Sequence, residues 1–419
     1  MSTSDDLFGQ TYQQLLSKAA GGNENFQLVY PYIDWWWPTA PTGQIDARAL
    51  GLVNTIPQWS AIGQFQPGSS ALFNSYGQVL QHVNPTIPPD QQQAVTNAHN
   101  SLIAAQNQYQ NDQTARNQAW AVAGSNLPPG VPPLDWVSWN NDSGWTKTLQ
   151  ADSNAIAKAQ EVYAQAVGQQ SPALTAAIKA ATLPSATFPV TPGFTSVNQG
   201  DGSLVPAPAF SIGTTGQDWV AVLSQGGGNQ VTVDLSQSAS SYDYSKSWAG
   251  GNASYDRWFW SVNVGGSWSQ WNVDESDQSV QATISFTTTQ VLVTAGQWYN
   301  GGYLKSLAGQ NTFFSPWTST GGSSPIFGQG GLLPLQVVGL IAAYQPSFSI
   351  TMSQSSFSQA VQQFNASAGV RIGPFKFGGS GGHETNTVTK SASGTSFTGK
   401  STATYPFIIG VLVAQPGLS

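Results

Sequence analysis

Hydrophobic residues recur with one spacing in the first 180 residues of the chain and with another spacing after them. Seven-residue spacing marks two polar segments: Val95, Leu102 and Tyr109 in 88–124, and Leu149, Ile156 and Tyr163 in 144–169. An apolar stripe of this period is typical of helices that pack against each other. The pattern predicts two long helices, and the Pro- and Trp-rich link 125–144 would let them run antiparallel as a hairpin.

From about Leu183 the long helical periodicity ends, Pro, Gly, Ser and Thr become frequent, and β-branched residues alternate with polar ones. This part also contains an internal duplication, in which similar segments follow in the same order: Asp218–Ser240 with Gln336–Ser358, Gly251–Ser254 with Phe364–Ser367, Ser261–Gly266 with Gly369–Pro374, and Ala282–Gly296 with Ala403–Gly417. In each copy the pattern predicts two strands, then a polar segment, then an amphipathic strand pair, and finally an apolar strand.

Helices followed by strands predict an α+β protein. Its helical N-terminal domain contains the long helical hairpin, and a duplicated antiparallel β domain, sandwich- or barrel-like, follows. The predicted boundaries are a helical domain at 1–182, a linker at 183–205, a first β module at 206–300, a connection at 301–335 and a second β module at 336–419.

The amphipathic strand pairs are the candidate functional segments. In 256–276 the apolar side chains fall on even positions, namely Trp258, Trp260, Val262, Val264 and Trp268, and small, polar, uncharged residues fall on odd ones. In the second copy the residues that share one face are Phe364, Ala366, Ala368, Val370 and Ile372, and after Pro374 the phase slips to Phe375 and Phe377, as a bulge would produce. Both copies are interpreted as having an uncharged hydrophilic opposite face.

Two interpretations of these strand pairs remain open. They could form one buried face of a sandwich or barrel, as half-buried antiparallel strands do. They could instead be membrane-inserting hairpins, which need strands of about 9–11 residues with an apolar outward face. The position of these strand pairs in the folded protein distinguishes the two interpretations. Detachable flaps at 239–282 and 356–402 favour insertion, and aromatic faces that form the main core disfavour it.

Trp35, Trp36 and Trp37 stand side by side before Pro38. Three adjacent Trp cannot all point into one core from a regular strand. They either fill a groove between domains or form an aromatic platform for a sugar, a lipid headgroup or a partner, because Trp has an apolar face and a polar N–H edge.

Composition narrows the classes of function. The net charge is −7 and the cations are scattered singly, which argues against nucleic acid as a partner. Only 8% of residues are charged, so solvation depends on Gln, Asn, Ser, Thr and Gly. With no Cys there are no disulfides or thiolate sites, and the first residues lack the features of a Sec signal. We expect a protein that is soluble before it meets its target and is secreted or released by another route.

The residue pattern predicts no enzyme, no cofactor and no metal site. His82, His99 and His383 lie in different segments without metal-ligand spacing, and no nucleophile elbow, P-loop or dinucleotide motif is present. The acidic cluster Asp274, Glu275 and Asp277 fits a solvated hairpin tip or a calcium-binding loop. The pair His383–Glu384 fits an exposed turn.

The segments "FNASAGVRIGPFKFGGSGG" and "YPFIIGVLVAQPG" resemble those of an uncharacterised group of fungal and bacterial proteins. That group has a helical N-terminal part and duplicated Ser- and Trp-rich β modules. The resemblance covers about the last 200 residues and implies no activity.

Three hypotheses of function follow. The first is a non-enzymatic pore-forming protein that recognises a membrane lipid or glycan receptor through aromatics, assembles into a homo-oligomer and inserts its repeated hairpins into a closed barrel. The second is a glycan-binding or self-assembling module. The third is a carbohydrate hydrolase, which needs two carboxylates in a Trp-lined cleft.

Overall fold

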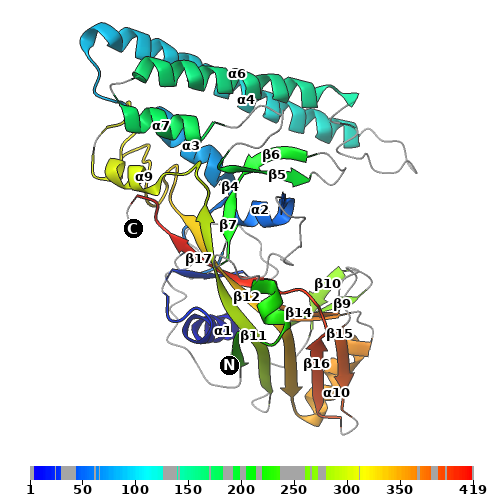
Figure 1. Cartoon of the computed structure of the whole chain (residues 1–419). Helices are drawn as coiled ribbons and strands as arrows, with labels where there is room; N and C mark the ends of the chain where they lie inside the picture. Colours follow the sequence, from blue (N-terminus) through cyan, green and yellow to red (C-terminus); the bar gives the residue numbers. More distant parts are fainter. Residues whose placement is uncertain are drawn as a thin grey trace.

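The computed structural model describes residues 4–417 apart from the gaps at 24, 30–43, 61–62, 66, 126–138, 140–141, 169–170, 183–191, 199–203, 214–218, 236–259, 265–266, 272–279, 311, 366–368, 379–385 and 392–393. Helices and antiparallel sheets are both present, which confirms the predicted α+β class. Figure 1 shows the long helices at one end of the molecule and most of the strands toward the other.

Two long antiparallel strands, β11 (Gln281–Ala295) and β12 (Gln336–Thr351), run through the molecule and connect these two ends (Figure 1). Alternate residues along most of β11 are buried, as a strand with one covered face requires. The other strands of this sheet are β8 (Asn229–Asp234) and β7 (Phe210–Ile212) beside β11, β16 (Ser396–Ser401) and β17 (Phe407–Ala414) beside β12, β15 (Asn386–Lys390) beside β16, and β1 (Phe26–Leu28) beside β17.

Close strand contacts in this sheet depend on two glycines. A Cβ added at Gly410 of β17 would lie 2.1 Å from a ring carbon of Phe26 on β1. A Cβ at Gly399 of β16 would lie 2.2 Å from the ring of Phe348 on β12. Aromatic rings therefore lie directly over backbone at both sites, and no other residue type would fit without a shift.

A smaller four-stranded sheet lies near the lower end of β11 and β12. Its strands, in spatial order, are β10 (Ser267–Gln270), β9 (Trp260–Val264), β13 (Gly369–Ile372) and β14 (Phe375–Gly378). The helix α10 (Gln354–Asn365) lies at the same end (Figure 1). The remaining small sheets are β2 (Gln44–Asp46) with β5 (Phe194–Asn198) and β6 (Leu204–Pro208), and β3 (Thr55–Pro57) with β4 (Pro67–Ala71).

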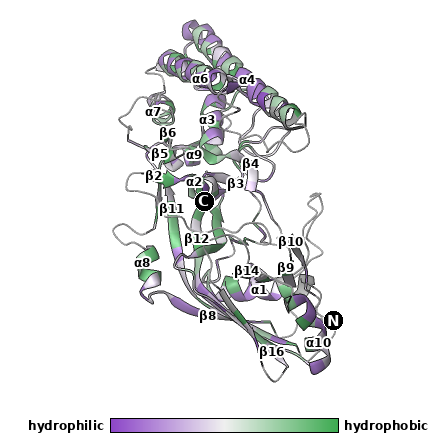
Figure 2. Cartoon of the chain, turned by 90° about the vertical axis from the view of Figure 1, so that its right-hand side faces the viewer, coloured by the Kyte–Doolittle hydropathy of each residue, from purple (hydrophilic) through white to green (hydrophobic). Residues whose placement is uncertain are grey.

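The predicted helical hairpin is present as α4 (Pro89–Ser125) and α6 (Trp145–Val167), which lie side by side and carry mixed hydrophilic and hydrophobic residues along their length (Figures 1 and 2). Val95, Leu102 and Tyr163 of the predicted stripes are buried. The hairpin joins the rest of the chain near α3 (Leu72–His82), α7 (Pro172–Ala180) and α9 (Gly301–Ala308). The short helices α2 (Ala47–Val53) and α8 (Trp219–Ser224) pack on the middle of the large sheet.

The N-terminal helix α1 (Ser4–Lys18) packs against the C-terminal half of the chain. Leu7, Tyr12 and Leu15 belong to the same buried cluster as residues of β8, β11 and β12, and β1 pairs with β17. Local periodicity cannot reveal such long-range contacts, so the prediction of one helical domain over 1–182 did not anticipate them. The domain boundaries themselves stay predictions.

The duplication holds in part. Strand β8 of the first copy corresponds to the end of β12 in the second copy, and β9 corresponds to β13. However, α8 is helical where the aligned residues 337–342 form a strand of β12, so the alignment of the start of the two copies is wrong. Trp219 and Leu223 of α8 are buried under the middle of the sheet, and that tertiary packing decides the local structure.

Candidate functional site

Two strand pairs of the small sheet, hereafter the first ribbon (β9 and β10) and the second ribbon (β13 and β14), belong to segments that leave the large sheet at one end. The chain leaves β8 after Asp234 and enters β11 at Gln281; it leaves β12 after Thr351 and enters β16 at Ser396. Asp234 pairs near the start of β11, and Thr351 pairs with both Gln281 and Ser396. Each ribbon thus connects two antiparallel neighbours of the same sheet, and both connections are at the same end.

The two ribbons pair with each other around a local twofold axis. Val262 of β9 is opposite Val370 of β13, and the neighbouring pairs are reciprocal: Ser261 with Arg371, and Asn263 with Gly369. Each ribbon closes with two residues between its strands, after Val264 in the first and after Ile372 in the second. The structure therefore makes these parts of the two copies alike in topology as well as in sequence.

The apolar face of both ribbons is buried in the main core of the lower half. Val262, Val370, Ile372, Phe375 and Phe377 are fully buried and Trp260 nearly so, together with buried residues of β8, β11 and β12. The ribbons thus form a separate sheet on one end of the large sheet, but their aromatic face is part of the main core, which is the arrangement that disfavours insertion. In this conformation they contact protein and not lipid.

The predicted bulge after Pro374 is wrong, because the chain reverses there. Ile372 pairs with Phe375 and Val370 with Phe377 across a tight turn that contains Gly373, whose φ is +53°. Residues opposite each other in an antiparallel pair point to the same side of the sheet, so the parity must change at a two-residue turn. The apparent slip of phase is the signature of a hairpin.

The opposite face of the second ribbon is not uncharged. Arg371 of β13 occupies a position where the sequence interpretation expected only neutral polar groups, and its register partner in β14 is Lys376. In the first ribbon, Ser261 and Asn263 on that side are buried.

The other predicted contact residues differ in their surroundings. Val264, at the end of β9, is 41% exposed, and Trp268 lies in β10 opposite Asn263. The following lie outside the described residues: Trp35, Trp36, Trp37, Trp258, Asp274, Glu275, Asp277, His383 and Glu384. Among the described residues, two further aromatics that the sequence did not single out are exposed: Trp59, at 48%, and Tyr405, at 38%.

Helix α10 holds the ribbons in place and was not predicted; the placement of Phe364 on the apolar face of a strand was wrong, because Phe364 lies in this helix. The indole N–H of Trp271, next to β10, donates to the carbonyl of Ala360 at 3.1 Å, and its ring packs edge-on against Phe397. Phe357 and Phe364 of α10 contact Phe397 as well. Phe357, Ala360, Val361 and Phe364 have the spacing i, i+3, i+4 and i+7, a helical signal that was available in the sequence.

The outer face of the lower sheet is rich in hydroxyl groups. Thr232 and Ser285 hydroxyls are 2.8 Å apart across β8 and β11, and Thr389 and Thr398 hydroxyls are 2.9 Å apart across β15 and β16. A shallow cavity of about 340 Å³ lies on this face, lined by Ser347, Phe348, Thr389, Thr398, Gly399 and Lys400. The hydroxyl groups of this surface can donate and accept hydrogen bonds. The ammonium group among the residues that line the cavity is that of Lys400.

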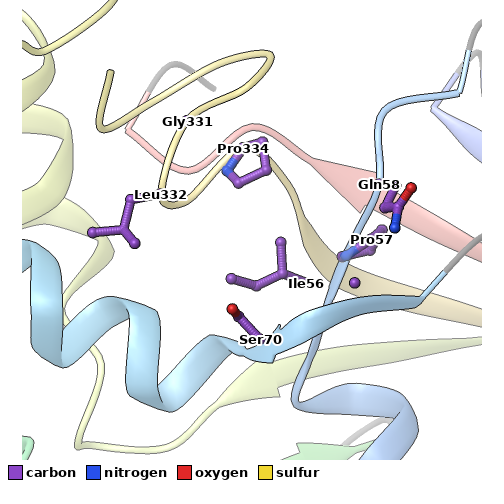
Figure 3. Close-up of a pocket in the computed structure, with 8 residues that line it drawn as sticks. Ile56, Pro57, Gln58, Ser70, Gly331, Leu332 and Pro334 are labelled. Carbon is purple, nitrogen blue, oxygen red and sulfur yellow. The ribbon is translucent and has the colours of Figure 1, made fainter. Parts of the chain in front are cut away.

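A second cavity, of about 200 Å³, lies between the strand pair β3–β4 and the loop before β12, with Trp59 next in sequence to one of its lining residues (Figure 3). Its walls are Ile56, Pro57, Gln58, Gly68, Ser70, Gly331, Leu332 and Pro334. These side chains include no acid, base or nucleophile stronger than a serine hydroxyl. The cavity could hold a small neutral group, and its lining provides no acid–base pair.

Carboxylates come together on the helical hairpin instead. Burial, and then the neighbouring Asp112, raise the pKa of Asp152. Asp112 lies on α4 and Asp152 lies on α6, and neither residue lines one of the two cavities. Within the described part of the chain, no cluster of three or more His, Cys, Asp or Glu could hold a metal ion, and no helix is long and apolar enough to cross a membrane.

Two histidines from different helices, His82 and His99, lie close together at the base of the helical hairpin. The ring of His82, on α3, stacks on Trp317 at 4.2 Å; the ring of His99, on α4, stacks on Phe314 at 4.3 Å; the two imidazole centroids are 6.4 Å apart. Tyr163 of α6 contacts His99 and donates from its hydroxyl to the carbonyl of Val83 at 3.0 Å. Burial, and then His99, lower the pKa of His82 from 6.5 to about 4, and burial lowers the pKa of His99.

This pair predicts a loss of stability in acid. The folded state binds fewer protons than the unfolded state between pH 6.5 and about 4, so the free energy of unfolding falls as the pH decreases through that window. We expect a loss of about 1–3 kcal/mol, because one pKa unit corresponds to about 1.4 kcal/mol and the His82 ring is partly exposed to solvent.

Denaturant unfolding at pH 7 and pH 4.5 measures this loss. His82→Gln with His99→Gln should flatten the pH dependence while leaving folding at pH 7 intact. Equal slopes in the variant and the parent would show that these histidines do not contribute.

Comparison of the chain with family models, curated proteins and solved structures found no match. The resemblance to the uncharacterised fungal and bacterial group therefore stays a prediction.

Proposed function

We propose that this chain is a non-enzymatic, membrane-acting protein of the pore-forming type, and that its two ribbons refold into membrane-inserting hairpins. The observation that carries the proposal is their placement. Each ribbon joins two antiparallel neighbours of one sheet, both at the same end, so that each can lengthen the strand pair to which it is attached.

The length of the connecting segments supports this rearrangement. Roughly 45 residues separate β8 from β11 and a similar number separate β12 from β16. Two spanning strands of about 9–11 residues each, with a turn, fit within that length. The strands of the folded ribbons have only 4 or 5 residues, so they must be rebuilt before they can span a bilayer.

Burial of the apolar face in the main core disfavours insertion from the folded state, so the proposal requires this core to open when the target is met. Residues such as Phe375 and Phe377 are withheld from water before the target is met. In the extended hairpins the same side chains would contact lipid, which replaces the apolar surroundings they lose. Backbone groups in the bilayer must all be paired, so insertion requires several copies that close into a ring of strands.

Dye release from liposomes tests the proposal. The panel is phosphatidylcholine alone and with added sterol, phosphatidylserine or glycolipid. We expect release from at least one composition together with oligomers on the vesicles. No release from any of them, with the protein still monomeric after exposure to lipid, would overturn it.

Glycan binding is a second candidate, favoured by the hydroxyl-rich cavity on the outer face. Ser347, Thr389, Thr398 and Lys400 present donors and acceptors of the kind that orient a saccharide. This candidate expects binding to a glycan array that Thr398→Val weakens and that occurs without dye release. A glycan array without signal would exclude it.

A further inference from the structure

Side chains of α1 satisfy the outer backbone edge of β8. The Gln14 amide donates to the carbonyl of Asp234 at 2.6 Å and accepts from its backbone N–H at 2.9 Å. The Lys18 ammonium donates to the carbonyl of Thr232 at 2.7 Å and to the Gln14 side-chain oxygen at 3.0 Å. These are bonds that a neighbouring strand would make, so α1 takes the place of a strand at this edge.

The opposite side of the same group of strands is covered by β15. In the order β8, β11, β12, β16, the strand β16 pairs with β15 over five residue pairs, from Asn386 with Ser401 to Lys390 with Phe397. The strand β15 follows the second ribbon in the chain and precedes β16. Lengthening of β12 and β16 by the second ribbon would therefore remove β15 from its place and open the β16 edge.

Strand directions allow the two edges to meet between copies. β8 is antiparallel to β11, β11 to β12, and β12 to β16, so β16 runs opposite to β8. The β16 edge of one copy can thus pair antiparallel with the β8 edge of the next. Both strands have 6 residues, so in full antiparallel register Thr232 of β8 is opposite Thr398 of β16.

We propose that the outer edge of β8 is the docking edge for β16 of a second copy, and that Gln14 and Lys18 of α1 keep it closed until the target is met. The inference rests on the proposed function, because it is the release of the second ribbon that opens the β16 edge. Exposed edges pair indiscriminately with other chains. Covering both of them keeps the copies apart before the ribbons are released.

Cross-linking between copies tests this edge. The chain has no Cys, so a mixture of two single-cysteine chains, Thr232→Cys on β8 and Thr398→Cys on β16, which are opposite each other in full antiparallel register, can form a mixed disulfide only between copies. We expect the mixed disulfide on the same panel of vesicles. Gln14→Ala with Lys18→Ala should raise its rate of formation at least roughly tenfold, because the hydrogen bonds that hold α1 on the edge are lost.

The matched control is Gln13→Ala with Ser17→Ala, which changes two exposed residues of the same helix that do not bond to β8. It should cross-link at the rate of the parent. Circular dichroism establishes that both double variants are folded.

The outcomes separate this inference from the proposed function. Mixed disulfides without dye release keep the docking edge and remove membrane permeation. Dye release without mixed disulfides keeps permeation and overturns the docking edge. Equal cross-linking rates for the parent and the Gln14/Lys18 variant would overturn the role of α1.

Discussion

A disulfide between the two ribbons is expected to abolish membrane leakage. Val262→Cys and Val370→Cys replace fully buried residues that are directly opposite each other in β9 and β13. Opposed residues of antiparallel strands have Cα atoms about 4.5–5.5 Å apart, which suits a disulfide. In the extended arrangement the first ribbon follows β8 and β11 and the second follows β12 and β16, so the pairing of β9 with β13 must break.

Dye release measures the effect of the lock. The oxidised protein should leak no more than vesicles without protein, and a reductant should restore the rate. The control is Thr283→Cys with Ser349→Cys, a pair on β11 and β12, which stay together throughout. If the oxidised ribbon lock leaks as fast as this control, the ribbons do not separate during insertion.

Phe377→Ala is expected to destabilise the folded protein by about 3–5 kcal/mol, the usual loss for a buried phenylalanine. Phe377 is fully buried and its ring lies edge-on to Phe348 of β12 at 4.6 Å. Removal of the ring leaves a cavity between the second ribbon and the large sheet. The ribbons should then exchange their amide hydrogens faster, both together, because β9 and β13 share hydrogen bonds.

Urea unfolding and hydrogen exchange measure these effects. Val264→Ala, on the exposed end of β9, is the control and should change the free energy of unfolding by less than about 0.5–1 kcal/mol. Faster exchange confined to β13 and β14 would contradict the coupling of the two ribbons.

Regular periodicity made part of the fold predictable. The α+β class and the long helical hairpin follow from apolar residues such as Leu102 and Tyr163, which lie on stripes that local spacing reveals and which are buried as expected. Val262 and Val370 were likewise placed on apolar faces, and the structure pairs them.

Contacts between distant segments could not be predicted in the same way. The proximity of the His82 and His99 rings depends on how α3 and α4 meet. The hydrogen bonds between Gln14 and Asp234 join residues that are 220 positions apart in the sequence. Burial of the ribbon faces also depends on tertiary packing, because one amphipathic pattern fits a core or a bilayer. The misread turn at Pro374 is different, since a two-residue loop was a possible interpretation of the same letters.

A fluorescent label at Val264→Cys tests most directly whether the ribbons leave the folded protein for the bilayer. The chain has no other cysteine, and this position is partly exposed to water in the folded state. On vesicles that release dye, the label's emission should shift to the blue and be quenched by lipid-attached quenchers, while a label at Thr232→Cys on the outer face should do neither. An unshifted, unquenched Val264 label on leaking vesicles would contradict insertion of the ribbons.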